Sequence, residues 1–185
     1  AIFALTTGLA PSATGNVTLD MAAGQGLTLA GGTIGGALSA SAAGITLGST
    51  ISVGGATQLR ARGLNIDQDS LSGLVTPSLD ASGNRITLLG GGNAITRILG
   101  ITGLDLTLSV PGGTRLAGPV TLTPILASGG TLDISTGGAV TQDAGSGGVT
   151  ARQLIARFTA PGGSVVLDAA GNAVATAGTP PFSSS

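Results

Sequence analysis

Apolar and polar residues alternate in short stretches along the chain. The recurring phrase is a β-branched residue or Leu, then Thr or Asp, then another apolar residue. Such an alternation places apolar side chains on one face of an extended strand and polar side chains on the other. We therefore predict strands of about three to five residues at 17–19, 27–29, 45–47, 86–88, 104–108, 120–122, 132–134, 140–141, 149–150 and 165–167.

Glycine-rich turns separate these strands, and the strands recur at a regular spacing. Glycine pairs such as Gly54-Gly55 and Gly137-Gly138 stand between the phrases, and related strands begin roughly every 20 residues. One unit of this size cannot bury its apolar face alone, so neighbouring units must stack. The pattern predicts an all-β fold, a β-solenoid over residues 1–178 with coils of about 20 residues and two or three strands each.

Some segments depart from the pattern. Residues 68–82 show no clear strand repeat and contain Thr76-Pro77, so we expect an irregular coil or a longer loop there. The alternation fails around Arg97, which predicts a bulge that turns this side chain outward. Residues 179–185 are rich in Pro and Ser and are expected to form a terminus or linker.

The two ends of the sequence carry a further expectation. Residues 1–5 are apolar and are expected to form the first strand, with the end of a signal peptide as the alternative. Neither end shows a polar amphipathic helix that would cover a terminal coil, and uncovered strand edges favour further pairing. We expect a piece of a longer chain or a subunit that stacks end to end.

Composition narrows the class of protein. Charged residues are 8% and aromatic residues 2% of the chain, and Lys, Glu, His, Cys, Trp and Tyr are absent. Low charge with high apolar content argues against disorder, and the absence of the helix formers Glu and Lys argues against helices. With a net charge of −1 the sequence offers no basic surface for nucleic acid. It has no apolar run long enough for a spanning helix and no aromatic girdle, so we expect no membrane insertion.

The densest polar cluster is the candidate surface site. If Leu59, Ala61, Leu64 and Ile66 face inward, the polar side chains between and beside them face outward. These side chains belong to Arg60, Arg62, Asn65, Asp67 and Asp69. Asn65-Ile66-Asp67 is similar to a motif of pectin-cleaving β-helix hydrolases, but the paired Asp, the His and the Arg-x-Lys motif of those enzymes are missing. We interpret the cluster as a solvated ion-pair patch.

The sequence lacks most of the residue types that catalysis and metal binding require. Without His, Cys, Glu or Lys, few general acids or bases and no zinc ligands are present besides Asp. We therefore expect no enzyme activity and no cofactor. Calcium at Asp67, Asp69 or Asp80 is a weak alternative, because the repeat of calcium-binding β-rolls is missing. Gly90-Gly91-Gly92-Asn93 does not match a phosphate-binding loop, since no Lys-Ser/Thr follows.

Several phrases resemble the repeats of filamentous-haemagglutinin-like exoproteins of the two-partner-secretion type. The resembling segments are 138–145, 149–154, 83–88 and 163–167, and the likeness extends over about residues 15–175. The resemblance implies a right-handed parallel β-helix that serves as an adhesin stalk or fibre. It also implies a secreted protein at the bacterial cell surface whose partners are itself or a host or neighbouring cell surface.

The alternative functions come from other β-solenoid classes. A self-assembling extracellular filament subunit that stacks end to end is the first alternative. A carbohydrate-binding solenoid would be expected to show an aromatic or acidic groove. An ice-binding solenoid would be expected to show ranked Thr-x-Thr, of which Thr121-Leu122-Thr123 is the one match.

Overall fold

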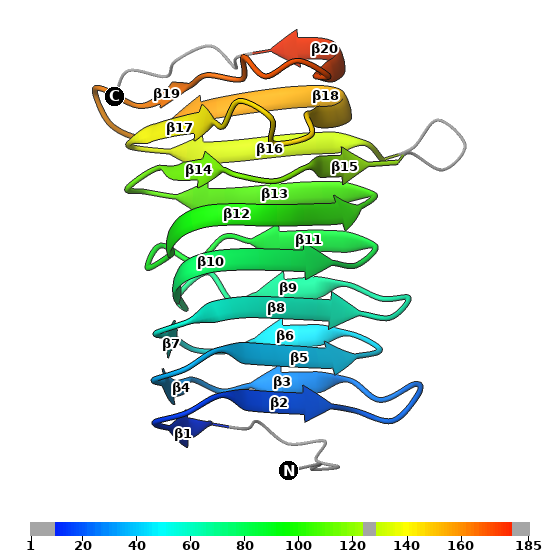
Figure 1. The fold of residues 1–185 in the computed structure, drawn as a ribbon, viewed down its shortest axis with the longest axis vertical. Helices are drawn as coiled ribbons and strands as arrows, with labels where there is room; N and C mark the ends of the chain where they lie inside the picture. Colours follow the sequence, from blue (N-terminus) through cyan, green and yellow to red (C-terminus); the bar gives the residue numbers. More distant parts are fainter. Residues whose placement is uncertain (1–9, 124–128, 179–185) are drawn as a thin grey trace.

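The computed structural model describes residues 10–123 and 129–178, which wind into a parallel β-solenoid (Figure 1). Its strands form about eight turns of roughly 21 residues, and the described residues contain no helix. Strand β2 (Val17–Asp20) runs to the right at the front of Figure 1, whereas β3 (Leu27–Leu29) returns to the left behind it as the chain rises. The coil is therefore right-handed, and the predicted fold class is confirmed. The expectations for residues 1–5 and 179–185 lie outside the described residues.

The strands stack in three columns, which we call the first, second and third faces. The first face contains β1 (Ser12–Ala13), β4 (Gly32–Ile34), β7 (Ile51–Val53), β14 (Thr114–Leu116), β17 (Ala139–Gln142) and β19 (Ser164–Val165). The second face contains β2, β5 (Leu38–Ala42), β8 (Ala56–Ala61) and β15 (Val120–Leu122). The third face contains β3, β6 (Ile45–Leu47), β9 (Ile66–Gln68), β11 (Arg85–Leu88), β13 (Asp105–Val110) and β16 (Thr131–Thr136).

Four longer strands continue around a corner of the solenoid. Strands β10 (Leu74–Ser82) and β12 (Ala94–Gly103) run from the first face onto the second. Strands β18 (Val149–Phe158) and β20 (Ala173–Gly178) run from the second face onto the third. Each coil therefore presents three extended segments, joined by corners that are either turns or bends within a strand.

The core consists of apolar ladders that run along the solenoid axis. On the third face Leu27, Ile45, Ile66, Ile86 and Leu106 pair from coil to coil, and each is at most 4% exposed. Full burial of such a side chain contributes about 1.5–3 kcal/mol. Because each coil packs against its two neighbours, stability accumulates coil by coil rather than around one centre.

The expected irregular segment at 68–82 is wrong for residues 74–82, which form the nine-residue strand β10. Leu74 pairs with Ile51 on the first face, and Ser78 pairs with Ala56 on the second. Pro77 lies between these two pairings, at the corner, where its missing N–H interrupts neither ladder. Proline therefore marks a bend within this strand rather than the absence of a strand.

Two expected side-chain directions have different outcomes. Arg97 is exposed, as predicted, and a bulge follows it: Leu79 pairs with Ile98 and Asp80 with Gly100, which leaves Leu99 as the extra residue. The inward direction expected for Leu64 is wrong. This residue lies in the turn between β8 and β9 and is 58% exposed, because the turn interrupts the alternation of the strands.

Glycine allows successive turns to stack directly on each other at the corner between β7 and β8. The N–H of Gly54 donates to the carbonyl of Ile34, and the N–H of Gly55 donates to that of Gly36, both at 2.8 Å. A Cβ atom on Gly54 would overlap the carbonyl oxygen of Gly35 in the preceding coil. The glycine pairs of the sequence thus serve the close approach of one turn to the next.

Candidate functional site

The five residues of the predicted polar cluster do not form one patch. Arg60 lies on β8 of the second face, and Asp67 lies on β9 of the third face. Arg62 and Asn65 lie in the turn between these strands, where the Oδ1 atom of Asn65 accepts the N–H of Arg85 at 3.3 Å. The next turn contains Asp69, whose Oδ1 accepts the N–H of Leu71 at 3.1 Å. The corner of the solenoid separates the basic residues from the acidic ones.

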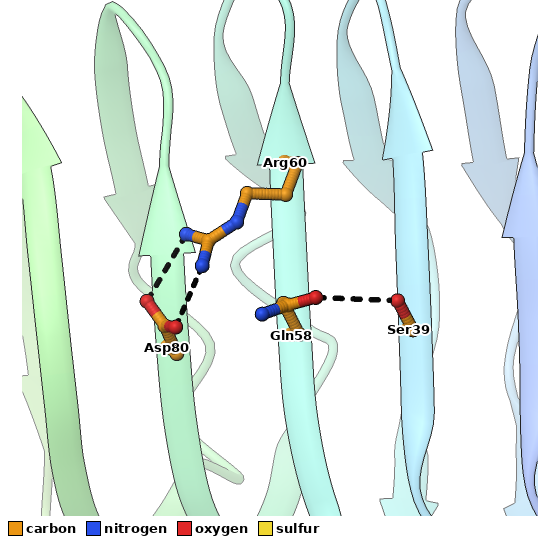
Figure 2. A network of polar contacts seen from close by, with 4 residues as sticks. All are labelled: Ser39, Gln58, Arg60 and Asp80. Atoms are coloured by element: carbon orange, nitrogen blue, oxygen red, sulfur yellow. Dashed lines mark hydrogen bonds and ion pairs between the residues drawn. The ribbon is translucent and has the colours of Figure 1, made fainter.

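The two arginines of this cluster bind acids from other coils instead. Each terminal nitrogen of Arg60 donates a hydrogen bond to one carboxylate oxygen of Asp80 on β10, at 3.0 and 2.6 Å (Figure 2). Arg62 forms an ion pair with Asp20 on β2, with 3.1 Å between Nη2 and Oδ1, and donates to the carbonyl of Met21. The cluster therefore supports stacking of coils, and Asp67 remains exposed on the third face.

A polar network continues from Arg60 along the second face. Ser39 on β5 donates to the Oε1 atom of Gln58 on β8 at 3.4 Å, and Figure 2 shows this contact beside the arginine–aspartate pair. The residues come from three successive coils. Their side chains lie on the outer surface, so the network decorates the face without enclosing a cavity.

Three further ion pairs join neighbouring coils. They are Arg85–Asp105 at 3.8 Å, Arg157–Asp133 at 3.0 Å and Arg115–Asp143. The hydrogen bond to Asp143, helped by its charge, raises the pKa of Arg115 above its usual value, and Asp133 does the same to the pKa of Arg157. Both arginines would be charged at neutral pH without this shift. These pairs therefore act on coil stacking rather than on proton transfer.

Outward hydroxyl and carboxylate side chains form files that cross the coils. On the third face one file pairs residues in register from β3 to β16: Thr28, Thr46, Asp67, Thr87, Thr107 and Asp133. On the second face Ser82, Thr102, Thr121 and Thr150 form another file. Thr121 thus belongs to a file of separate coils, which a search for Thr-x-Thr within one strand does not detect.

Two open grooves run across these faces. The larger, of about 480 Å³, lies on the third face, and its wall includes Thr28, Thr46, Leu64, Asn65 and Asp67. The second, of about 440 Å³, lies beside β14 on the first face. The larger groove offers hydroxyl, amide and carboxylate groups for hydrogen bonding, and Leu64 is the exposed apolar side chain in its wall. Asp67 is its single acid, so it lacks the carboxylate pair that glycoside cleavage uses.

The three candidate calcium ligands are not gathered by the fold. Asp80 binds Arg60 on the second face, Asp67 lies on the third face, and Asp69 caps a turn. Among residues 10–123 and 129–178 no group of three or more His, Cys, Asp or Glu residues is placed to hold a metal ion. In the same residues no helix is long and apolar enough to cross a membrane.

Sequence reasoning missed the partners of the arginines. Asp80 and Asp20 are the acids that bind Arg60 and Arg62, and they are 20 and 42 residues away in the chain. The signal was present, because these separations are close to one and two coil lengths. Using it requires the exact length of each coil, and that length varies with the corners.

The described fold defines a repeat protein of the β-solenoid class. The chain belongs to the family described as Repeats of unknown function (DUF5649), whose model matches residues 14–76 and 103–179. These two segments make up more than half of the chain, and the gap between them, residues 77–102, contains most of β10, all of β11 and most of β12. No curated protein and no solved structure matches the chain.

Proposed function

We propose that this chain is a structural and adhesive segment, a stalk or fibre part of a secreted protein at the bacterial cell surface. The supporting observation is the unbroken stack of coils, in which each apolar ladder continues across neighbouring strands. Five arginine–aspartate pairs join separate coils on the outside of the same stack. Such a stack resists bending because every coil is fixed to the next by backbone, core and charge.

The outer surface fits a display role. The files of Thr, Ser and Asp offer hydrogen-bond donors and acceptors at a rung spacing of about 4.8 Å, with few free charges. The finer resemblance to filamentous-haemagglutinin-like exoproteins is part of this proposal and rests on the phrases at 83–88 and 138–145. The proposed partners are another copy of the chain or the surface of a host or neighbouring cell.

A filament subunit is the second candidate. In the described residues, β1, β2 and β3 pair on one side only, and so do β19 and β20 at the other end of the stack. Open strand edges of this kind can pair with a further coil. That coil would come from the same chain in a stalk and from another copy in a filament.

Electron microscopy distinguishes these functions. The protein is isolated from the cells that make it and labelled with antibody against this chain. Label along discrete rods supports the stalk. Uniform fibres that also form from the purified chain alone support the filament subunit. Label on compact globular particles contradicts both.

A further inference from the structure

The same arrangement of amide side chains occurs at two corners of the solenoid, with Gln68, Asn93 and Gln142 buried and Asn172 partly buried. Gln68 and Asn93 donate to each other's side-chain oxygens at 2.7 and 2.9 Å. Gln142 and Asn172 do the same at 2.9 and 2.8 Å. Each glutamine occupies an inward position, and at Gln68 and Gln142 the exposure is 7% and 9%. We call each glutamine–asparagine pair an amide clamp.

The first clamp also holds the backbone of two successive corners. The Oδ1 atom of Asn93 accepts the N–H of Leu74 at 2.8 Å, which is the first residue of β10. The Oε1 atom of Gln68 accepts the N–H of Gly90 at 2.8 Å, in the corner of the next coil. Gln68 therefore binds the corner that contains Asn93, and Asn93 binds the strand that follows the corner of Gln68. These contacts are in addition to the hydrogen bonds between the two side chains.

The second clamp repeats these contacts. The Oδ1 atom of Asn172 accepts the N–H of Val149 at 2.7 Å, which is the first residue of β18. The Oε1 atom of Gln142 accepts the N–H of Ala169 at 3.2 Å. The residue that donates its N–H to the glutamine, Gly90 or Ala169, stands three residues before the asparagine in both corners. Two different corners of the fold therefore use one construction.

Asn93 extends its clamp to a further coil. Its Nδ2 atom lies 3.1 Å from the carbonyl oxygen of Leu88 and 3.0 Å from that of Ser109. Leu88 ends β11 of its own coil, and Ser109 lies on β13 of the following coil. One buried side chain therefore contacts three successive coils.

The chain needs a device that distinguishes one coil from another. The inward residues of the third face are nearly the same in each coil, for example Leu27 and Leu29, Ile45 and Leu47, and Ile86 and Leu88. Apolar ladders built from such residues find similar apolar partners if one coil is looped out, and only that coil loses its burial. The alternation of buried and exposed residues determines which side chains face the core, but it does not determine which coil supplies the partner strand. A buried polar pair is a known way to fix such a register.

We propose that the two amide clamps fix the register in which the coils stack. Skipping a coil would separate Gln68 from Asn93, or Gln142 from Asn172, and would leave a buried amide without its partner. An unpaired buried amide is unfavourable. The apolar ladders oppose the slip only through the burial that the looped-out coil loses, because they offer similar partners in either register. This inference concerns the assembly of the solenoid and does not depend on the proposed function.

Disulfide trapping in the full chain tests the register directly, because the chain contains no cysteine. Thr46, Asp67 and Thr87 are outward residues on three successive coils of the third face. Cysteines at 46 and 67 are neighbours in the described register. Cysteines at 46 and 87 are two rungs apart, about 9.6 Å, which is too far for a disulfide. A 46–87 disulfide therefore forms when the intervening coil is skipped.

The clamp is removed from both sides at once, so that no side-chain amide is left without its partner, although the N–H groups of Leu74 and Gly90 lose their side-chain acceptors. Gln68→Leu repeats the residue of the preceding rung, Leu47, and is combined with Asn93→Ala. We expect the 46–87 disulfide to be absent with the natural clamp and to appear in the double variant, with loss of part of the 46–67 disulfide. The comparison is Thr57→Val with Thr76→Val, a buried pair that also joins two coils but through one side-chain hydrogen bond of 2.9 Å rather than two. It should shift the two yields less than the clamp variant does.

The second clamp provides an independent repeat of the test. The variant is Gln142→Leu with Asn172→Ala, and the yield of each disulfide is measured as before. A disulfide between cysteines at 121 and 150 reports the described register, and one between cysteines at 121 and 173 reports a skipped coil. The proposal is overturned if the double variants fold, by circular dichroism, and keep only the disulfides of the described register. It is also overturned if both double variants fail to fold, because the pairs would then be required for stacking itself.

Discussion

Arg60 and Asp80 form a two-hydrogen-bond ion pair between neighbouring coils, with distances of 3.0 and 2.6 Å (Figure 2). About a third of each side chain is exposed, so solvent screens the attraction. The pair lies on the outer side of the second face, directly over coils whose inner sides are apolar. Like the other four arginine–aspartate pairs of the described residues, it connects one coil to another.

Removal of this ion pair should weaken the solenoid slightly. Arg60→Gln is expected to lower the free energy of unfolding by up to about 1 kcal/mol, the range of partly exposed pairs. The loss should shrink at high salt because screening already weakens the natural pair. Urea unfolding at low and high salt measures both effects. Arg97→Gln is the control, since Arg97 forms no ion pair with any described residue; an equal loss there would refute the pair's role.

The apolar ladders should contribute much more than the ion pairs. Ile86 is fully buried between Ile66 and Leu106. Ile86→Ala is expected to lower the free energy of unfolding by about 2–5 kcal/mol, because the removed atoms leave a cavity between two rungs. Leu71→Ala serves as the comparison, since Leu71 is 94% exposed, and should change stability by less than about 0.5 kcal/mol. Similar losses in thermal or urea unfolding would contradict the described core.

The stacked turns predict a glycine requirement at specific positions. Gly54→Ala would push a Cβ atom into the carbonyl of Gly35 and is expected to cost about 1–3 kcal/mol, as overpacking does. Gly91→Ala has open space around it and should have little effect. The two variants are compared by urea unfolding. If Gly91→Ala were the more damaging, the described packing of the corners would be incorrect.

Stability should be nearly independent of pH over a wide range. Asp and Arg are the only side chains that titrate, because His, Cys, Tyr, Lys and Glu are absent. The ordinary pKa values of these two side-chain types both lie outside the range between pH 5.5 and 10. The pKa values of Arg115 and Arg157 are raised in the folded protein, so their ion pairs contribute fully to stability below the unfolded-state pKa. This contribution is lost only as the pH rises through the folded-state pKa, which lies above the tested range of pH. Urea unfolding from pH 5.5 to 10 should therefore vary by less than about 1 kcal/mol; a larger variation contradicts this account.

The fold could be predicted because one local rule repeats. The alternation at 27–29, 45–47 and 86–88 and the spacing between these phrases are local properties of the sequence, and both define the ladders. Residues 74–82 were missed because Pro77 and the corner interrupt the same alternation inside one strand. Proline is a strand breaker in most contexts, so the sequence alone favoured a loop.

The surface site could not be predicted to the same degree. Whether Arg60 meets Asp67 or Asp80 depends on which side of a corner each residue occupies and on the length of the intervening coil. Paired first-face residues in neighbouring coils are separated by as few as 18 residues at Arg97–Arg115 and as many as 26 at Arg115–Thr141. Local patterns do not determine these lengths, and the register between coils follows from contacts such as those of Gln68 and Asn93.

The proposed role as a surface stalk or fibre is tested most directly by labelling intact cells of the organism that makes the protein. Antibody raised against the purified chain is applied before and after the cells are permeabilised, and a cytoplasmic protein is labelled as the control. The proposal predicts full labelling of intact cells, with no increase on permeabilisation, and loss of the label after brief treatment with external protease. Labelling that occurs only after permeabilisation would contradict it.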